Sequence, residues 1–169
     1  MLNDGYVEDI VEAKIPKSTW IGTAVGIFFI IISLLLFITI KWGITLIFVG
    51  IVVIIIAMSY KDVEYEYLFL NDNVDIAKIS RKSNRKDIYH INGGDVTVIA
   101  PVDSTYIDNI HQKGEDVRIR DFSGLAAKDT PEQVYAFMIN RGNSYEEVHL
   151  KVSERTLKHL QQFFKDKIK

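Results

Sequence analysis

Hydrophobic positions follow two different patterns along the chain. Between residues 20 and 60, 31 of 41 residues are hydrophobic, and Lys41 is the only charged one. After residue 61, short apolar runs alternate with polar residues and are separated by clusters of Asn, Asp, Gly and Ser. Continuous apolar runs predict membrane-spanning helices, whereas alternation predicts strands with one buried face. The pattern therefore predicts a membrane segment joined to a β-rich soluble domain.

The membrane segment divides into two apolar runs. Residues 20–40 carry no charge and, at about 1.5 Å per residue, are long enough to cross a hydrocarbon core of about 30 Å. Residues 44–60 form a shorter run, and Lys41, Trp42 and Gly43 suit a tight interfacial turn between the two. We expect a transmembrane helical hairpin over residues 20–60. A cleaved signal peptide is the competing interpretation, but the acidic N-terminus is unlike a basic leader.

Flanking charges predict the orientation of this hairpin. Lys14, Lys17 and Lys61 lie on the side of the termini, and Lys41 lies on the side of the hairpin tip. Because cytoplasmic flanks carry an excess of Lys and Arg, we expect both termini in the cytoplasm. Neither run contains an ionisable residue or a proline, which transport pathways normally need, so the hairpin is interpreted as an anchor.

Small residues recur at a spacing of seven in both runs, and a GxxxG match adds one more glycine to the first. Such stripes let helix backbones approach closely in lipid. We expect these positions to pack the two helices against each other, and homodimerisation is the alternative. The candidate helix-packing residues are Gly22, Gly26, Ser33, Gly43, Gly50 and Ala57, with Thr19 at the start of the first stripe.

Residues 1–19 are interpreted as a separate amphipathic segment. A helix over residues 3–15 would place Tyr6, Val7, Ile10 and Val11 on one face and would end at Pro16. It would lie at the membrane interface or act as a strap against the soluble domain, and a frayed tail is the alternative.

Residues 61–169 are predicted to form the soluble domain. Turn residues around positions 71–73 and 141–143 indicate two hairpins. The predicted strands cover residues 63–70, 74–80, 87–91, 96–101, 117–122, 133–140 and 145–152.

Two helices complete the prediction for this domain. Ser153 is placed as the N-cap of a C-terminal amphipathic helix, and residues 102–116 indicate a short helix. Seven antiparallel strands closed by a C-terminal helix match the number of strands and the terminal helix of a pleckstrin-homology-like (PH-like) barrel. The predicted fold class is thus a membrane-anchored α+β protein with a PH-like barrel, and a partly open α+β roll is the alternative.

Composition excludes several classes of protein. The chain has 20 Lys and Arg against 22 Asp and Glu and no cysteine, which excludes a disulfide scaffold, a cysteine-based zinc site and a strongly basic nucleic-acid binder. One segment departs from this balance, because Arg81, Lys82, Arg85 and Lys86 place four cations within six residues. We expect them at a hairpin tip, either as a solvated loop or in contact with anionic lipid head groups.

Catalytic and metal-binding patterns are absent from the sequence. His90, His111, His149 and His159 lack the spacing of metal ligands, and no GxSxG, Walker or GxGxxG motif occurs. The pair Glu64 and Glu66 is interpreted as part of a solvated strand face near Lys78 or Arg81. We therefore predict no catalytic residue, no metal and no cofactor.

Several segments resemble a known family. The stretches concerned are Asn3-Asp4-Gly5-Tyr6-Val7-Glu8, the DVEYEYLFL run at residues 62–70, Asp75-Ile76-Ala77-Lys78-Ile79 and Lys82-Ser83-Asn84-Arg85-Lys86. They are similar to a family of uncharacterised bacterial membrane proteins catalogued as domain of unknown function 6106. The resemblance implies a bacterial cell membrane location, two close spans and a soluble domain, and it implies no activity.

These observations predict a non-enzymatic, membrane-anchored interaction module that presents a cytoplasmic PH-like domain to a protein or lipid partner. An accessory subunit of a larger membrane complex is the first alternative. A membrane-bound hydrolase that uses dispersed Asp, Glu and His residues is the second.

Overall fold

A computed structural model describes residues 5–15, 17–36, 43–112, 117–142 and 144–169. The chain forms two compact units. The helical unit contains Lys14–Val63 and Ser80–Ser83, and the sheet unit contains Met1–Ala13, Glu64–Ile79 and Asn84–Lys169.

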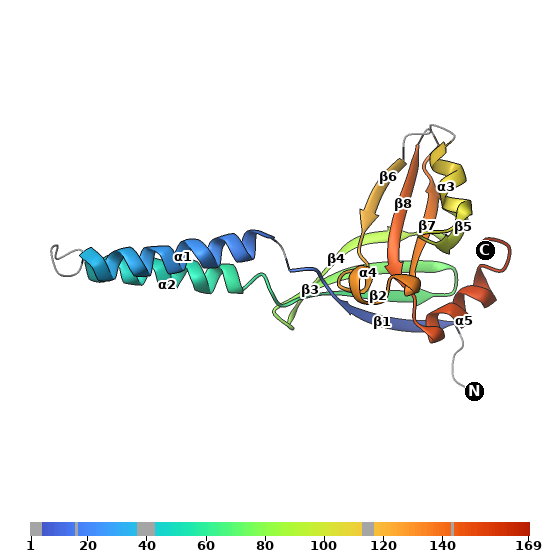
Figure 1. Ribbon diagram of the computed structural model, residues 1–169. Coiled ribbons are helices and arrows are strands. Elements are labelled where there is room, and N and C mark those ends of the chain that lie inside the picture. The colour runs from blue at the N-terminus through green and yellow to red at the C-terminus, as the bar shows by residue number, and fades with distance from the viewer. Residues whose placement is uncertain (1–4, 16, 37–42, 113–116, 143) are drawn as a thin grey trace. The chain divides into compact units, whose positions relative to one another are not determined.

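Two antiparallel helices make up most of the helical unit (Figure 1). They are α1 (Lys17–Leu36) and α2 (Gly43–Met58), and the predicted turn residues Lys41 and Trp42 lie outside the described residues. Glycine allows their close contact, because a Cβ added to Gly26 would lie 2.9 Å from the carbonyl oxygen of Gly50.

The two helices differ in how far they can reach. Residues Lys17–Leu35 of α1 are long and apolar enough to cross a membrane. The shorter apolar stretch Ile44–Met58 does not meet that length, because the 16 residues of α2 extend about 24 Å at about 1.5 Å per residue. Among the described residues, one helix is thus long and apolar enough to span a membrane, and the predicted second span is not established.

The first sheet of the sheet unit, sheet A, has the order β1-β2-β3-β4. Its strands are β1 (Tyr6–Glu12), β2 (Val63–Leu70), β3 (Asn73–Ser80) and β4 (Asn84–Ile91). The bounds of β2 match the prediction, and Asn71 adopts a positive φ of 53° at the predicted turn between β2 and β3.

The predicted N-terminal helix is wrong. Residues 6–12 instead form β1, which pairs antiparallel with β2 from Tyr6 opposite Leu70 to Glu12 opposite Glu64. Val7 and Val11 alternate with outward residues and are buried, so the strand gains both a hydrogen-bonded partner and an apolar contact. These gains outweigh a short segment's weak helical preference.

The second sheet, sheet B, has the order β5-β7-β8-β6. Its strands are β5 (Val96–Pro101), β6 (Val117–Asp121), β7 (Val134–Asn140) and β8 (Tyr145–Lys151). β7 pairs antiparallel with β5 and β8, whereas β6 pairs parallel to β8. The prediction of a seven-stranded antiparallel barrel is therefore wrong, because eight strands within the described residues form two four-stranded sheets in an α+β fold.

Short helices connect and cover the strands. They are η1 (Gly93–Asp95), α3 (Thr105–Gln112), α4 (Ala126–Asp129), η2 (Pro131–Gln133) and α5 (Glu154–Phe163). α3 lies within the predicted segment 102–116. The predicted N-cap is confirmed, since the hydroxyl of Ser153 accepts a hydrogen bond of 3.2 Å from the amide of Thr156.

The main core joins both sheets and α5. Fully buried Tyr67 and Phe69 of β2 belong to the same cluster as Phe137 of β7, Leu150 of β8 and Leu160 of α5. A smaller cluster packs Ile107 of α3 against the opposite face of sheet B. Because one face of sheet A fills the main core, alternate residues of β1 and β2 point outward.

Candidate functional site

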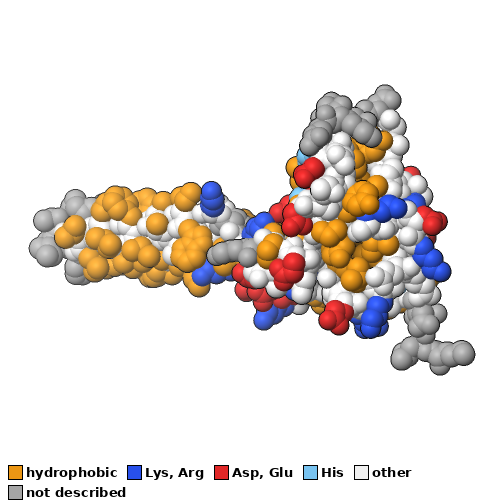
Figure 2. Space-filling model, turned by 45° about the vertical axis from the view of Figure 1, so that its right-hand side comes forward, with side chains coloured by type: hydrophobic (Ala, Val, Ile, Leu, Met, Phe, Trp, Pro, Cys, Tyr) orange, Lys and Arg blue, Asp and Glu red, His pale blue; other side chains and the backbone are white. Residues whose placement is uncertain are grey.

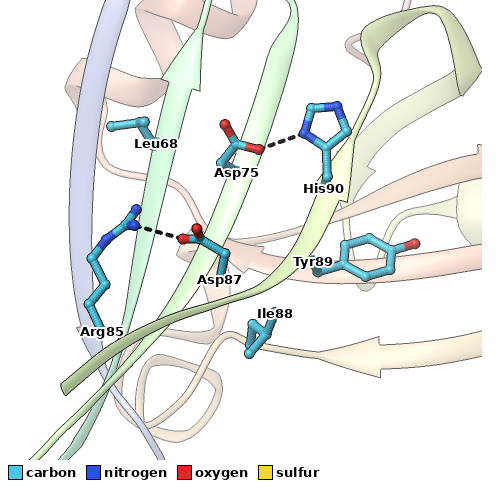
Figure 3. A pocket seen from close by; sticks show the side chains of 7 residues that line it. All are labelled: Leu68, Asp75, Arg85, Asp87, Ile88, Tyr89 and His90. Atoms are coloured by element: carbon cyan, nitrogen blue, oxygen red, sulfur yellow. Dashed lines mark hydrogen bonds and ion pairs between the residues drawn. The ribbon is translucent and has the colours of Figure 1, made fainter.

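The outer face of sheet A contains an open depression of about 520 Å³. Figure 3 shows the side chains that line it, which come from three neighbouring strands. They are Leu68 of β2, Asp75 of β3, and Arg85, Asp87, Ile88, Tyr89 and His90 of β4.

Two polar pairs hold the side chains of this depression. His90 Nδ1 lies 2.5 Å from Asp75 Oδ1, and both side chains are about half exposed (Figure 3). Arg85 donates to Asp87 Oδ1 at 2.6 Å and also binds the carboxylate of Glu66. Hydrogen bonding to Glu66, which exceeds the effect of desolvation, raises the pKa of Arg85. The guanidinium is therefore shared between two carboxylates.

The outer face of sheet A also exposes large apolar side chains from β1 and β2. Tyr6 (40% exposed) lies opposite Leu70 (48%), and Ile10 (54%) lies two positions further along β1. Ile88 (37%) of β4 is also exposed and lines the depression. The solvated face of an antiparallel sheet is normally polar, so these exposed apolar side chains depart from the usual pattern.

Acidic residues accompany these apolar side chains. Glu8 lies opposite Leu68, Glu12 lies opposite Glu64, and Glu66 lies opposite Ile10. Like charges placed directly opposite across strands are unfavourable. The outer face of sheet A thus combines exposed apolar groups with an excess of carboxylates.

The predicted basic tip divides into two parts. Arg81 and Lys82 form the β3–β4 turn with positive φ angles of 54° and 56°. Arg85 and Lys86 instead lie on β4 itself, so the prediction that all four cations sit at a hairpin tip is wrong. The reason is that β4 begins at Asn84, three residues before the predicted start. The carboxylate of Glu66, which the sequence analysis placed on a solvated strand face near Lys78 or Arg81, binds Arg85.

Most predicted helix-packing residues lie between α1 and α2. A Cβ added to Gly22 would lie 2.9 Å from Cβ of Ala57, and one added to Gly50 would lie 2.8 Å from Cγ1 of Ile30. Ser33 is fully buried, and its hydroxyl donates to the carbonyl oxygen of Ile30 at 2.8 Å. Gly43 begins α2, and its surroundings lie outside the described residues.

A cluster that the sequence analysis missed lies on sheet B. Buried Glu147 of β8 binds two imidazoles, with His149 Nε2 and His111 Nε2 each 2.5 Å from one of its oxygens. Burial opposes ionisation, but the hydrogen bonds with His149 and then His111 outweigh it and lower the pKa of Glu147. The pair Glu147 and His149 is two residues apart on one strand face, which is a signal that the sequence did contain.

A second missed cluster joins the two sheets around Glu146. Its carboxylate accepts hydrogen bonds of 3.1 Å from Arg141 Nε and Arg120 Nε, and the hydroxyl of Tyr89 also binds it. Burial opposes ionisation, but the hydrogen bonds from Tyr89, Arg141 and Arg120 lower the pKa of Glu146 to about 2. The residues come from β4, β6, β8 and the β7–β8 turn, so only the fold brings them together.

The remaining histidine, His159, bonds to the main chain and not to a carboxylate. His159 of α5 is buried. Its Nε2 atom lies 2.7 Å from the carbonyl oxygen of Asn71, and its ring centre lies 4.6 Å from that of Phe163. Within the part of the chain that the structure describes, no group of three or more His, Asp and Glu residues is arranged to hold a metal ion.

Comparisons with known proteins give one result. No curated protein and no solved structure shows a significant match to the chain. The model of one protein family matches residues 3–169, and that family is described as a bacterial PH-like domain, DUF6106, of unknown function. The match covers the two sheets, the helical unit and β1 alike, so the chain belongs to the bacterial PH-like domain family DUF6106.

Proposed function

We propose that the protein is a non-enzymatic, membrane-anchored interaction module. In this proposal α1 and α2 form a two-span anchor in the bacterial cell membrane, with both termini in the cytoplasm. The PH-like domain binds a protein partner through the outer face of sheet A.

The surface of the helices supports the anchor. Trp20 (63% exposed), Phe48 (65%) and Leu35 (70%) are large apolar residues that point away from the helix contact. Figure 2 shows hydrophobic side chains covering most of the visible surface of these helices. Exposing this much apolar surface to water is costly, whereas lipid tails cover it without loss. α2 is short, but thinning of the bilayer and interfacial side chains can accommodate a short span at modest cost.

The single observation that carries the interaction proposal is the outer face of sheet A. It exposes Tyr6, Ile10 and Leu70 beside the same strands that form a depression of about 520 Å³, and exposed Ile88 lines that depression. Glu8 and Glu12 add negative charge to the same face. A partner segment that carries both apolar and basic side chains would bury the former and neutralise the latter.

Photo-crosslinking in intact membranes tests this surface. A photoreactive amino acid replaces Ile88 in the full-length protein, and a matched variant carries it at Gln161, which is exposed on α5. We expect a discrete adduct from position 88 and none from position 161. Glu8→Lys should weaken the adduct at position 88 by reversing a surface charge, whereas Glu132→Lys on η2 should leave it unchanged. Equal adducts from both faces would contradict the proposal.

The same experiment distinguishes this proposal from the first alternative, an accessory subunit of a larger membrane complex. If the protein is an accessory subunit of a larger membrane complex, exposed positions of the helices contact another protein's helices. A photoreactive group at Ile31, which is 52% exposed on α1, would then give a protein adduct. Adducts to lipid alone at this position agree with a simple anchor.

A further inference from the structure

The helical unit has a strongly basic end. Because α1 and α2 are antiparallel, the start of α1 and the end of α2 lie at the same end of the unit, and Gly22 packs against Ala57 there. Three separate parts of the sequence bring cations to this end: the start of α1, the residues after α2 and the β3–β4 turn. We name this group the basic collar, and it consists of Lys17, Lys61, Arg81 and Lys82.

The charge of this unit is unbalanced. Asp62 is the only acidic residue in the segments Lys14–Val63 and Ser80–Ser83. The collar is thus a local excess of positive charge in a chain whose formal net charge is −2. Its location next to an apolar helix surface gives it the form of a juxtamembrane polybasic site.

A main-chain hydrogen bond fixes the β3–β4 turn to the residues that follow α2. The amide of Arg81 donates to the carbonyl oxygen of Asp62 at 2.8 Å. Arg81 and Lys82 are both left-handed, with φ angles of 54° and 56°, and both side chains are exposed. A conformation that favours Gly and Asn is occupied here by two cations. The turn therefore holds two exposed positive charges close to the end of the apolar helices.

Aromatic residues complete the collar. Lys61 Nζ lies 5.6 Å from the centre of the Trp20 ring, and Trp20 is 63% exposed. Tyr60, next to Lys61, is 56% exposed. Trp and Tyr rings favour the level of the lipid head groups, where one side of the ring is apolar and the other is wet. Trp20 thus marks the depth at which the cations of the collar would meet the lipid surface.

We propose that the basic collar binds anionic lipid head groups and thereby holds the β3–β4 turn at the membrane surface. This inference rests on the proposed function, since it requires the helices to be inserted in a bilayer. It differs from the sequence-based expectation in its residues, because Arg85 is bound by Glu66 and Asp87. Arg85 is therefore not part of the basic collar.

Fluorescence of Trp20 provides the test. The sequence contains two tryptophans, so Trp42→Phe leaves Trp20 as the only one. The full-length protein is reconstituted in two preparations of phosphatidylcholine vesicles with the same minor fraction of phosphatidylglycerol. Bromine atoms are placed on the phosphatidylglycerol chains in one preparation and on an equal fraction of phosphatidylcholine chains in the other. Since bromine quenches tryptophan at short range, the ratio of quenching reports which lipid lies beside the collar.

We expect brominated phosphatidylglycerol to quench Trp20 about twofold more than brominated phosphatidylcholine, and the excess to shrink with added salt. Arg81→Asn with Lys82→Asn should bring the ratio close to one, because asparagine tolerates the left-handed turn but carries no charge. Lys158→Gln with Lys165→Gln removes the same charge from two exposed positions near the C-terminus and should leave the ratio unchanged. Thermal unfolding of each variant confirms that it is folded.

The remaining outcomes separate the two proposals. Equal quenching by both brominated lipids, or equal loss in both charge variants, would overturn the lipid site while leaving the anchor in place. Absence of quenching in both preparations would show that Trp20 is not in a bilayer and would overturn the anchor itself. Loss of the excess on adding inorganic phosphate at constant ionic strength would assign the collar to a soluble phosphate and overturn the lipid assignment.

Discussion

The carboxylate of Asp9 accepts a hydrogen bond of 2.8 Å from the hydroxyl of Ser153, the residue that caps α5. The hydroxyl of Thr156 in the first turn of α5 also binds this carboxylate. The first strand of sheet A is thereby joined to the last helix of the chain. A carboxylate at this position also complements the positive end of the helix dipole.

Asp9→Ala should lower the free energy of unfolding by about 1–3 kcal/mol, because it leaves two hydroxyls without their acceptor and removes the favourable charge. Denaturant unfolding of the full-length protein in detergent, followed by circular dichroism, measures this loss. Glu8→Ala is the control, since Glu8 is exposed and hydrogen-bonds to Tyr6 on its own strand. A similar loss in both variants would contradict a role for the Asp9 contact.

Gly124 and Gly142 provide a matched pair of positive-φ glycines. Gly124 has φ 62° and approaches β1 so closely that an added Cβ would lie 2.1 Å from the carbonyl oxygen of Glu12. Gly142 has φ 83°, and an added Cβ would meet nothing within 4 Å. Gly142→Ala should therefore cost about 1 kcal/mol from the backbone alone.

Gly124→Ala should cost at least about twice as much, because backbone atoms must also move. The same unfolding measurement compares the two variants. A smaller loss for Gly124→Ala than for Gly142→Ala would show that the loop before α4 does not approach β1 in this way.

Local patterns predicted many of the elements. The alternation of Val63, Tyr65, Tyr67 and Phe69 gave the bounds of β2, and Ser153 was predictable as a cap because its chemistry is local. The strand β1 was not predictable, since the apolar pairs Tyr6-Val7 and Ile10-Val11 fit a short helix as well as a strand. Its partner lies more than 50 residues away, and that pairing decides the outcome.

The candidate sites were likewise only partly predictable from local sequence. The cations Arg81 and Lys82 were visible as a charge run, but the commitment of Arg85 to two carboxylates depends on strand order. The parallel pairing of β6 with β8 brings Arg120 to Glu146, and no local feature of residues 117–121 specifies it. The partners of Arg85 and Arg120 therefore follow from strand pairing and not from their local sequence.

Glu146 makes the stability of the sheet unit depend on pH. Its pKa is about 2 in the folded protein against an ordinary value of 4.5. Because the folded value is the lower one, its stabilising contribution is complete above about pH 4.5 and is lost as the pH falls towards 2. The contribution is on the order of 2 kcal/mol after allowance for solvent screening.

Urea unfolding at a series of pH values measures this effect as the difference between the native protein and Glu146→Gln. We expect the difference in free energy of unfolding to decrease steadily below about pH 4.5. Taking a difference between the two proteins removes the contribution of Glu147, whose pKa is also lowered. A difference that does not change with pH would contradict the assignment of this titration to Glu146.

An engineered disulfide can test the contact between α1 and α2. The sequence contains no cysteine, so two introduced cysteines can pair only with each other or with those of a second copy. A Cβ at position 22 lies 2.9 Å from Cβ of Ala57, within about 1 Å of the usual Cβ spacing of about 3.8 Å in a disulfide. Gly22→Cys with Ala57→Cys should therefore form an intramolecular disulfide on mild oxidation in membranes. Ile21→Cys with Ile55→Cys is the control, because both side chains are exposed on the helices. A covalent dimer of the first variant on non-reducing gels would instead assign the small-residue stripes to homodimerisation.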